Sequence, residues 1–188
     1  MTERAVRLLA LGLTAFVVVL DQATKVVVDR LLQLHESRDL LSGVLQLTYV
    51  RNRGAAFGIL SEARLPYQSW LFAAIGVAVL LAIGIYGWRL PAGSSLPRLT
   101  LALMIGGAVG NLIDRVRLGY VIDFIDVYWG RHHWPAFNVA DSSITIGVAL
   151  LVLDMVRQPR AQPAGPGSER PDPPGAATPN VAAGPAGD

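Results

Sequence analysis

Apolar residues in this chain gather in four long stretches that are separated by polar connections. The second stretch, residues 65–88, carries no charged side chain. A helix rises about 1.5 Å per residue, so about 20 residues cross the ~30 Å hydrocarbon layer of a bilayer. The pattern therefore predicts an all-α membrane protein with four transmembrane helices, at about residues 8–28, 65–88, 98–116 and 137–156.

The first stretch has a second interpretation. Arg4 and Arg7 followed by a run of apolar residues resemble the start of a secretory signal peptide. Apolar character resumes at residues 26–28 after a polar patch, which favours a span that is not cleaved.

Gly106 and Gly110 in the third stretch are four residues apart. This small-xxx-small spacing favours close helix packing in lipid. The same spacing also arises by chance in a glycine-rich chain, so both interpretations stay open.

The connection between the first two spans has the pattern of a strand. Residues 44–51 alternate between two faces, and Asn52, Arg53 and Gly54 are typical of a turn. We therefore expect a small β-sheet at about residues 40–60, against one face of the membrane domain. The domain is predicted to cover residues 1–157, followed by a disordered Pro/Gly/Ala-rich tail at 158–188.

Composition agrees with a membrane protein, because 52% of the residues are hydrophobic and only 16% are charged. The net charge of +2 gives no reason to expect a nucleic-acid partner. The absence of cysteine excludes disulfides and thiol chemistry. Arginines divide seven to eight between the two sides of a four-span topology, so charge alone does not orient the chain.

Polar residues stand where the spans meet one side of the membrane. Ionisable groups at membrane depth cost about 2.5–3.5 kcal/mol on insertion scales, which makes each a functional candidate. In a four-span topology they fall at one face: Asp21, Lys25, Asn111, Asp114, Arg115, Asp123, Asp126, Asn138 and Asp141.

Structural roles are available to several of these residues. Asp21 and Lys25 are four residues apart and can pair on one helix face. Asn138 with Asp141 three residues later resembles a helix N-cap with an acid in the first turn.

Carboxylate chemistry is the remaining class of catalysis. The sequence contains no HExxH, GxSxG or Walker motif, and the adjacent His132 and His133 do not make a metal site. Two neighbouring carboxyl groups share a proton, so that one acts as base and the other as acid. The spacing leaves open which pair does so among Asp21, Asp114, Asp123, Asp126 and Asp141.

Five motifs resemble those of the bacterial lipoprotein signal peptidase family, signal peptidase II. They are DQATK at 21–25, NRGAAFG at 52–58, GNLIDR at 110–115, VIDF at 121–124 and FNVADS at 137–142. The resemblance implies a membrane aspartic endopeptidase, with Asp123 and Asp141 as the catalytic pair. It also implies that eight residues line or support the site: Asp21, Lys25, Asn52, Gly54, Asn111, Asp114, Arg115 and Asn138.

The resemblance further implies the substrate and the topology. The substrates are prolipoproteins carrying a diacylglyceryl-cysteine, cut immediately before that cysteine. The protein would lie in the bacterial inner membrane among its lipids, with both termini cytoplasmic and the active site and β-cradle periplasmic. No metal or other cofactor is expected, and globomycin is the expected inhibitor. We also expect residues 44–60 to close over the substrate as a clamp.

Two other classes of protein have buried acids in a small membrane domain. A proton-coupled transporter would place its acids near the middle of the membrane, whereas here they lie at the ends of the spans. A membrane assembly factor without enzymatic activity would not require paired acids.

Overall fold

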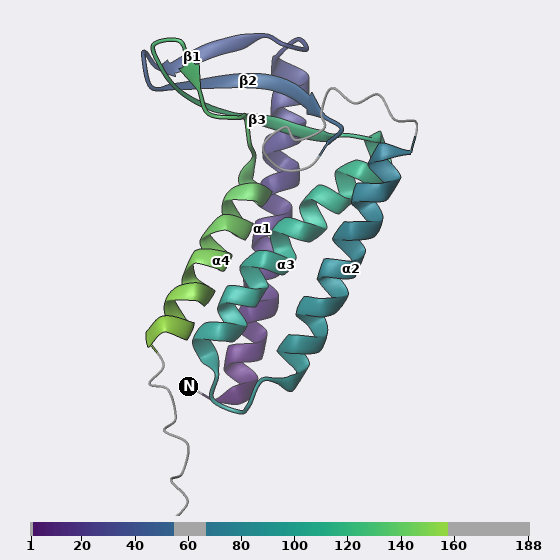
Figure 1. Cartoon of the computed structure of the whole chain (residues 1–188), viewed down its shortest axis with the longest axis vertical. Helices are drawn as coiled ribbons and strands as arrows, with labels where there is room; N and C mark the ends of the chain where they lie inside the picture. The colour runs from purple at the N-terminus through teal and green to yellow at the C-terminus, as the bar shows by residue number, and fades with distance from the viewer. Residues whose placement is uncertain (1, 55–66, 158–188) are drawn as a thin grey trace, which may run out of the picture. The chain divides into compact units, whose positions relative to one another are not determined.

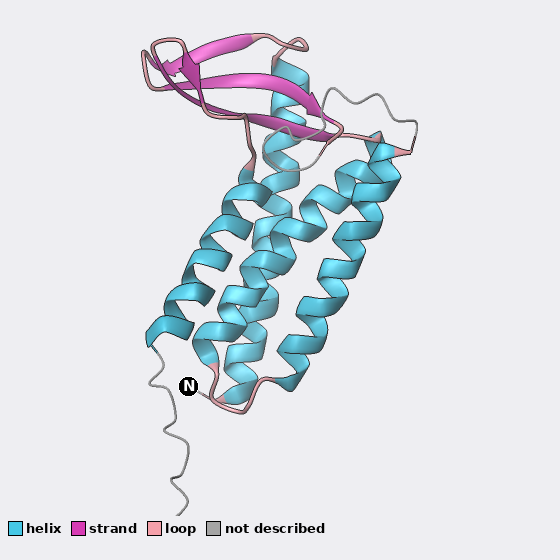
Figure 2. Cartoon of the chain, in the orientation of Figure 1, coloured by secondary structure: helices cyan, strands magenta, loops and turns pink. Residues whose placement is uncertain are grey.

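Four helices and a small antiparallel sheet make up residues 2–54 and 67–157, which the computed structural model describes (Figure 1). The elements in chain order are α1 (Glu3–Leu31), β1 (Ser37–Leu41), β2 (Leu45–Asn52), α2 (Gln68–Arg89), α3 (Ser95–Leu118), β3 (Val121–Trp129), β4 (His132–His133) and α4 (Val139–Arg157). All four helices are long and apolar enough to cross a membrane, which confirms the four predicted spans. Figure 2 shows the strands gathered at one end of the helices.

Helix α1 is longer than a membrane span requires. Its N-terminus is capped by the Thr2 hydroxyl, which accepts a hydrogen bond from the Ala5 N–H at 3.3 Å. Its 29 residues correspond to about 43 Å, against a hydrocarbon layer of ~30 Å. The last turns therefore extend to the sheet, where Val28 belongs to a buried apolar core with strand residues.

The sheet takes strands from two connections in the order β1-β2-β3-β4. The predicted β-cradle was expected wholly between the first two spans, and this expectation is incomplete because β3 and β4 precede α4. The strand β3 lacks an alternating pattern since residues 121–124 are all buried. A strand segment that is buried on both faces gives no period-2 signal. Residues 55–60 of the expected cradle lie outside the described residues.

A bulge interrupts the pairing of β2 with β3. Leu47 pairs with Ile125 and Val50 with Asp123, so two residues of β2 oppose one of β3. Tyr49, within the bulge, is buried and donates its hydroxyl to Asp29 Oδ1 on α1 at 2.5 Å. The bulge therefore joins the sheet to the end of α1.

Glycines bring α3 close to its neighbours. A Cβ at Gly106 would lie 2.8 Å from Val17 Cβ, and one at Gly110 would lie 2.5 Å from Asp21 Oδ2. A Cβ at Gly107 would overlap the carbonyl oxygen of Ala140. The small-xxx-small interpretation is therefore confirmed, and the close approach lets side chains near the ends of α1, α3 and α4 meet.

Candidate active site

A buried ion cluster joins α1 to α3. The Lys25 ammonium lies 2.9 Å from Asp21 Oδ2 and 2.9 Å from Asp114 Oδ2, and it donates to Asn111 Oδ1 at 2.9 Å. The three charged side chains are at most 3% exposed. The predicted pairing of Asp21 with Lys25 is confirmed, and the cluster also includes α3. We call Asp21, Lys25 and Asp114 the buried cluster.

The carboxylates of the buried cluster also accept backbone hydrogen bonds. Asp21 Oδ1 accepts from the Ala140 N–H at 2.9 Å, in the first turn of α4. Asp114 Oδ2 accepts from the Ile122 N–H at 3.2 Å, in β3. The cluster thereby positions the start of α4 and the residue of β3 that precedes Asp123.

Asn138 caps α4 as its spacing to Asp141 predicts. Asn138 Oδ1 accepts from the Asp141 N–H at 2.9 Å, and the Asn138 N–H donates to Asp141 Oδ2 at 3.3 Å. This reciprocal cap holds Asp141 in the first turn of α4, where the helix dipole stabilises a carboxylate.

Two amide side chains connect Asp123 to Asp141. Asn138 Nδ2 donates to Asp123 Oδ1 at 2.7 Å, and Asn111 Nδ2 donates to Asp141 Oδ1 at 2.8 Å. Asn138 Nδ2 also donates to Asn111 Oδ1 at 3.2 Å, and Asn52 Nδ2 donates to Asp123 Oδ2 at 2.9 Å. The two carboxyl groups therefore belong to one hydrogen-bond network built from four separate elements.

Asp123 lies in a β-strand, and burial changes its acidity. Burial, together with the nearby Asp141 carboxyl, raises the pKa of the Asp123 carboxyl to about 7. Hydrogen bonds from Asn52 and Asn138 act in the opposite direction. A carboxyl group with this pKa exchanges its proton near neutral pH, as a general acid or base must.

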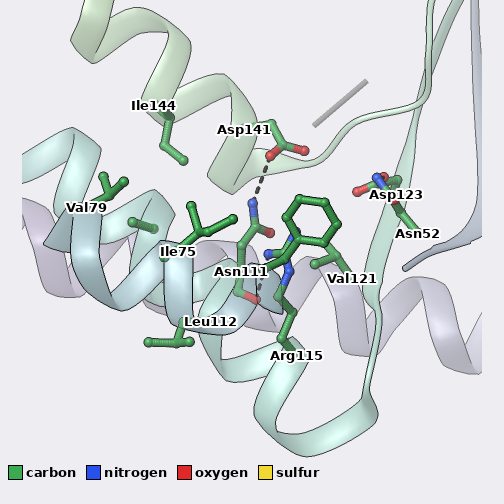
Figure 3. Close-up of a pocket in the computed structure, with 13 residues that line it drawn as sticks. Asn52, Ile75, Val79, Asn111, Leu112, Arg115, Val121, Asp123, Asp141 and Ile144 are labelled. Atoms are coloured by element: carbon green, nitrogen blue, oxygen red, sulfur yellow. Dashed lines mark hydrogen bonds between the residues drawn. The ribbon is translucent and has the colours of Figure 1, made fainter. Parts of the chain in front are cut away.

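Both acids line a cavity of about 340 Å³ between the helices and the sheet (Figure 3). Its other polar lining residues are Asn52, Asn111 and Arg115. Apolar walls come from the helices, among them Phe72, Ile75, Val79, Leu112 and Ile144. We call this cavity the bundle pocket; its size and lining suit an amphiphilic ligand.

Arg115 forms one edge of the bundle pocket. Its guanidinium group donates to the Gly54 carbonyl at 3.2 Å and to the Asn111 carbonyl at 3.3 Å. It also lies 5.9 Å from the centre of the Phe72 ring. Gly54 in turn donates its N–H to Asn52 Oδ1 at 2.8 Å, so the predicted turn brings two site residues to Arg115.

The structure separates the five candidate acids by location. Asp123 and Asp141 line the bundle pocket, whereas Asp21 and Asp114 hold Lys25 behind it. Asp126 lies further along β3, 2.9 Å from His133 Nδ1. All ten predicted site residues therefore belong either to the pocket or to the network that supports it.

Three features of the site were not predicted. Gln22 donates to Asp114 Oδ1 at 2.9 Å and to the Gly110 carbonyl at 3.2 Å. The sequence signal for Gln22 was its polar side chain within an apolar span, which could have marked it as a site residue. The apolar wall from α2 and the close approach at Gly107 have no such signal, because they are contacts between distant segments.

Comparison with known proteins gives consistent results. Residues 13–157 match the family model described as signal peptidase (SPase) II. The chain is 53% identical over 149 residues to a lipoprotein signal peptidase of Geobacter metallireducens, covering 79% of this chain and 91% of that protein. It is 46% identical over 153 residues to a lipoprotein signal peptidase of Cupriavidus taiwanensis, covering 81% and 85%.

Solved structures share the fold. One bacterial membrane enzyme has a TM-score of 0.71 at 34% identity and covers 78% of this chain and 87% of that chain. Another has a TM-score of 0.69 at 32% identity and covers 80% and 94%.

Proposed function

This chain belongs to the signal peptidase II family, and we propose that it works as an aspartic endopeptidase with Asp123 and Asp141 as its catalytic pair. It is a multi-pass membrane peptidase that removes signal peptides from prolipoproteins. The observation that supports the aspartic mechanism is the shared pocket, in which Asn111 and Asn138 connect the two carboxyl groups.

The pair divides the work of an acid and a base. We assign the shared proton to Asp123, because its pKa of about 7 keeps much of it protonated at neutral pH. Asp141, which receives two N–H donors at a helix N-terminus, is the carboxylate that removes a proton from water. The resulting hydroxide attacks the carbonyl carbon of the scissile peptide bond while Asp123 protonates the carbonyl oxygen.

Breakdown of the tetrahedral intermediate returns both protons. Asp141 gives its proton to the departing amine nitrogen, and the C–N bond breaks. Asp123 recovers its proton from the hydroxyl group as the new carboxyl group forms. Water has been added across the peptide bond, and each aspartate is back in its starting state.

The surrounding residues orient the substrate. Arg115 and the asparagines hold the extended peptide between the acids, while the apolar walls receive the signal peptide and the diacylglyceryl chains. The bond that is cut is the one immediately before the lipidated cysteine. The buried cluster and Gly54 support this arrangement. The clamp at residues 44–60 stays a prediction, since residues 55–60 lie outside the described part of the chain.

The decisive experiment is cleavage of a diacylglyceryl-modified prolipoprotein peptide by purified variants. We expect Asp123→Asn and Asp141→Asn each to lower the rate by at least about a thousandfold. Asp39→Asn, an exposed aspartate of β1, is the matched control and should cleave normally. Thermal unfolding in detergent checks that each variant is folded. A folded variant of either acid that still cleaves would end the proposal.

For the membrane orientation, we propose a bacterial inner-membrane protein with both termini, and thus the tail at 158–188, on the cytoplasmic side. The site and sheet would then face the periplasm. The start of α1 and the end of α4 lie at the end of the helices away from the sheet (Figure 1). Because the chain lacks cysteine, Ser42→Cys and Ala92→Cys give single labels. An impermeant maleimide added from the periplasm should label Ser42→Cys alone, and the reverse result would invert the orientation.

Globomycin is the proposed inhibitor of this site, and membrane lipids are its proposed surroundings. The reaction requires two carboxyl groups and water, so it needs neither a cofactor nor a metal ion. Inhibition is measured in the same peptide assay, and full activity with saturating globomycin would refute this part.

A further inference from the structure

A second cavity reaches Asp123 from the other side. It has a volume of about 350 Å³ and lies along the sheet. Its lining includes Thr48, Arg51, Asp126, His133 and Ala136. We call it the sheet pocket. Asn52 and Asp123 line both the sheet pocket and the bundle pocket, so the two cavities meet at a catalytic side chain.

The two pockets differ in chemistry. The walls of the bundle pocket are mostly apolar side chains of the spanning helices, whereas six of the ten residues that line the sheet pocket are polar or charged and lie on β2, β3 and β4. A prolipoprotein has the same division: its signal peptide and acyl chains are apolar, and the peptide after the lipidated cysteine is an ordinary polar backbone.

We propose that the peptide segment following the lipidated cysteine binds in the sheet pocket, where Asp126 accepts one of its backbone N–H groups. This inference rests on the proposed function, because it assigns the two sides of the scissile bond to the two pockets. Asp126 thereby becomes a residue that recognises the substrate without taking part in proton transfer.

One carboxylate oxygen of Asp126 has no hydrogen-bond partner among the described residues. The residue is 8% exposed. Its Oδ2 accepts from Gln46 Nε2 at 2.6 Å and lies 2.9 Å from His133 Nδ1. Its Oδ1 is the oxygen without a described partner, and it is buried. Leaving such an acceptor unpaired costs free energy, which a peptide N–H recovers.

Arg51 supplies the complementary donor. Its guanidinium group lies 5.3 Å from the centre of the Tyr49 ring and 4.8 Å from that of Tyr120. Its Nε donates to the Tyr49 hydroxyl at 3.0 Å, which holds the planar group in place. A peptide backbone presents both N–H and C=O groups, and the sheet pocket carries an acceptor for one and a donor for the other.

Two substrates separate this role from catalysis. One is a diacylglyceryl-modified peptide with a long segment after the cysteine, and the other ends in an amide directly at the cysteine. Asp126→Asn keeps the acceptor towards Gln46 and replaces the unpaired Oδ1 acceptor with an N–H donor. We expect it to lower kcat/KM about tenfold for the long substrate. Cleavage of the short substrate should stay at the parent rate.

Asp39→Asn makes the same chemical change on the same sheet but outside the pocket. It should cleave both substrates at the rates of the parent protein. An equal loss of Asp126→Asn activity on both substrates would overturn the inference, because the side chain would then act on the water, on the catalytic pair or on the fold. No loss on either substrate would overturn it as well. The proposed function fails separately, if Asp123→Asn cleaves the short substrate.

Crosslinking gives a second measurement that does not depend on a variant of Asp126. A photoreactive residue directly after the lipidated cysteine should crosslink to residues 133–136. One placed in the signal peptide should crosslink to α2 or α4. Crosslinks from the first probe to α2 would contradict the assignment of pockets.

Discussion

Two ion clusters join α1 to α3, and they differ in their access to solvent. Each combines an i,i+4 pair on α1 with one charged side chain of α3. One is the buried cluster, and the other, which we call the surface cluster, consists of Glu3, Arg7 and Arg98. In the surface cluster the side chains of Arg7 and Glu3 are 66% and 41% exposed, against 2% and 0% for Lys25 and Asp21 in the buried cluster.

The difference shows what burial adds to the same arrangement. An exposed pair contributes about 0–1 kcal/mol, because water and salt screen it. A buried pair must overcome its own desolvation, and removing one partner leaves an uncompensated charge. The buried cluster also binds backbone N–H groups of β3 and α4. Its contribution is therefore to position the elements that carry Asp123 and Asp141, whereas Arg98 of the surface cluster binds the backbone carbonyls of Leu90 and Pro91, between α2 and α3.

Removing the buried cation should have the largest effect. Lys25→Met leaves Asp21 and Asp114 without their shared partner, which we expect to cost roughly 3–5 kcal/mol of stability. Cleavage should fall as well, since Asn111 loses the ammonium that donates to its Oδ1. Thermal unfolding in detergent and the peptide assay measure the two effects. An unchanged Tm would show that burial adds nothing to this cluster.

Asp123 is a buried acid of a different kind, because its hydrogen bonds come from the amide side chains of Asn52 and Asn138. The ordinary pKa of an aspartate carboxyl is 3.8, and the pKa of Asp123 in the fold is about 7. The unfolded chain therefore loses this proton at lower pH than the folded chain does, and stability decreases as pH rises from about 4 to about 7. Asp123→Asn removes this penalty, so we expect it to be more stable than the parent at pH 8, by roughly 2–4 kcal/mol.

The two proteins should unfold at similar temperatures near pH 4, where the carboxyl group is protonated in both states. A stability difference that does not depend on pH would contradict the ionisation argument. The same titration should lower the cleavage rate of the parent as pH rises through about 7, because Asp123 then loses the proton that the proposed mechanism requires it to donate.

Removing the exposed cation should have the smallest effect. Arg7→Met deletes the i,i+4 partner of Glu3 but leaves Arg98 near that carboxylate. We expect a change of at most about 1 kcal/mol in stability and parent-like cleavage. If Arg7→Met destabilised the protein as much as Lys25→Met, exposure would not be what distinguishes the two clusters.

The positions of the helices and of most site residues were predictable because their signals are local. Long apolar runs defined the spans, the i,i+4 spacing predicted the pairing of Asp21 with Lys25, and the i,i+3 spacing predicted the cap that Asn138 forms with Asp141. The strand β3 was not predicted, because burial of residues 121–124 on both faces removes the alternation by which strands are recognised.

By itself, the sequence determined the membrane class, the four spans and the set of polar residues at their ends. Spacing alone left five acids equivalent, and the resemblance of the motifs distinguished them. Only the tertiary structure placed Asp123 and Asp141 on one cavity with Lys25 behind it and Asp126 in a second one. The reason is physical: spacing along a helix or strand determines which neighbours share a face, whereas the meeting of distant segments depends on how closely the helices pack, here through Gly107 and Gly110 of α3.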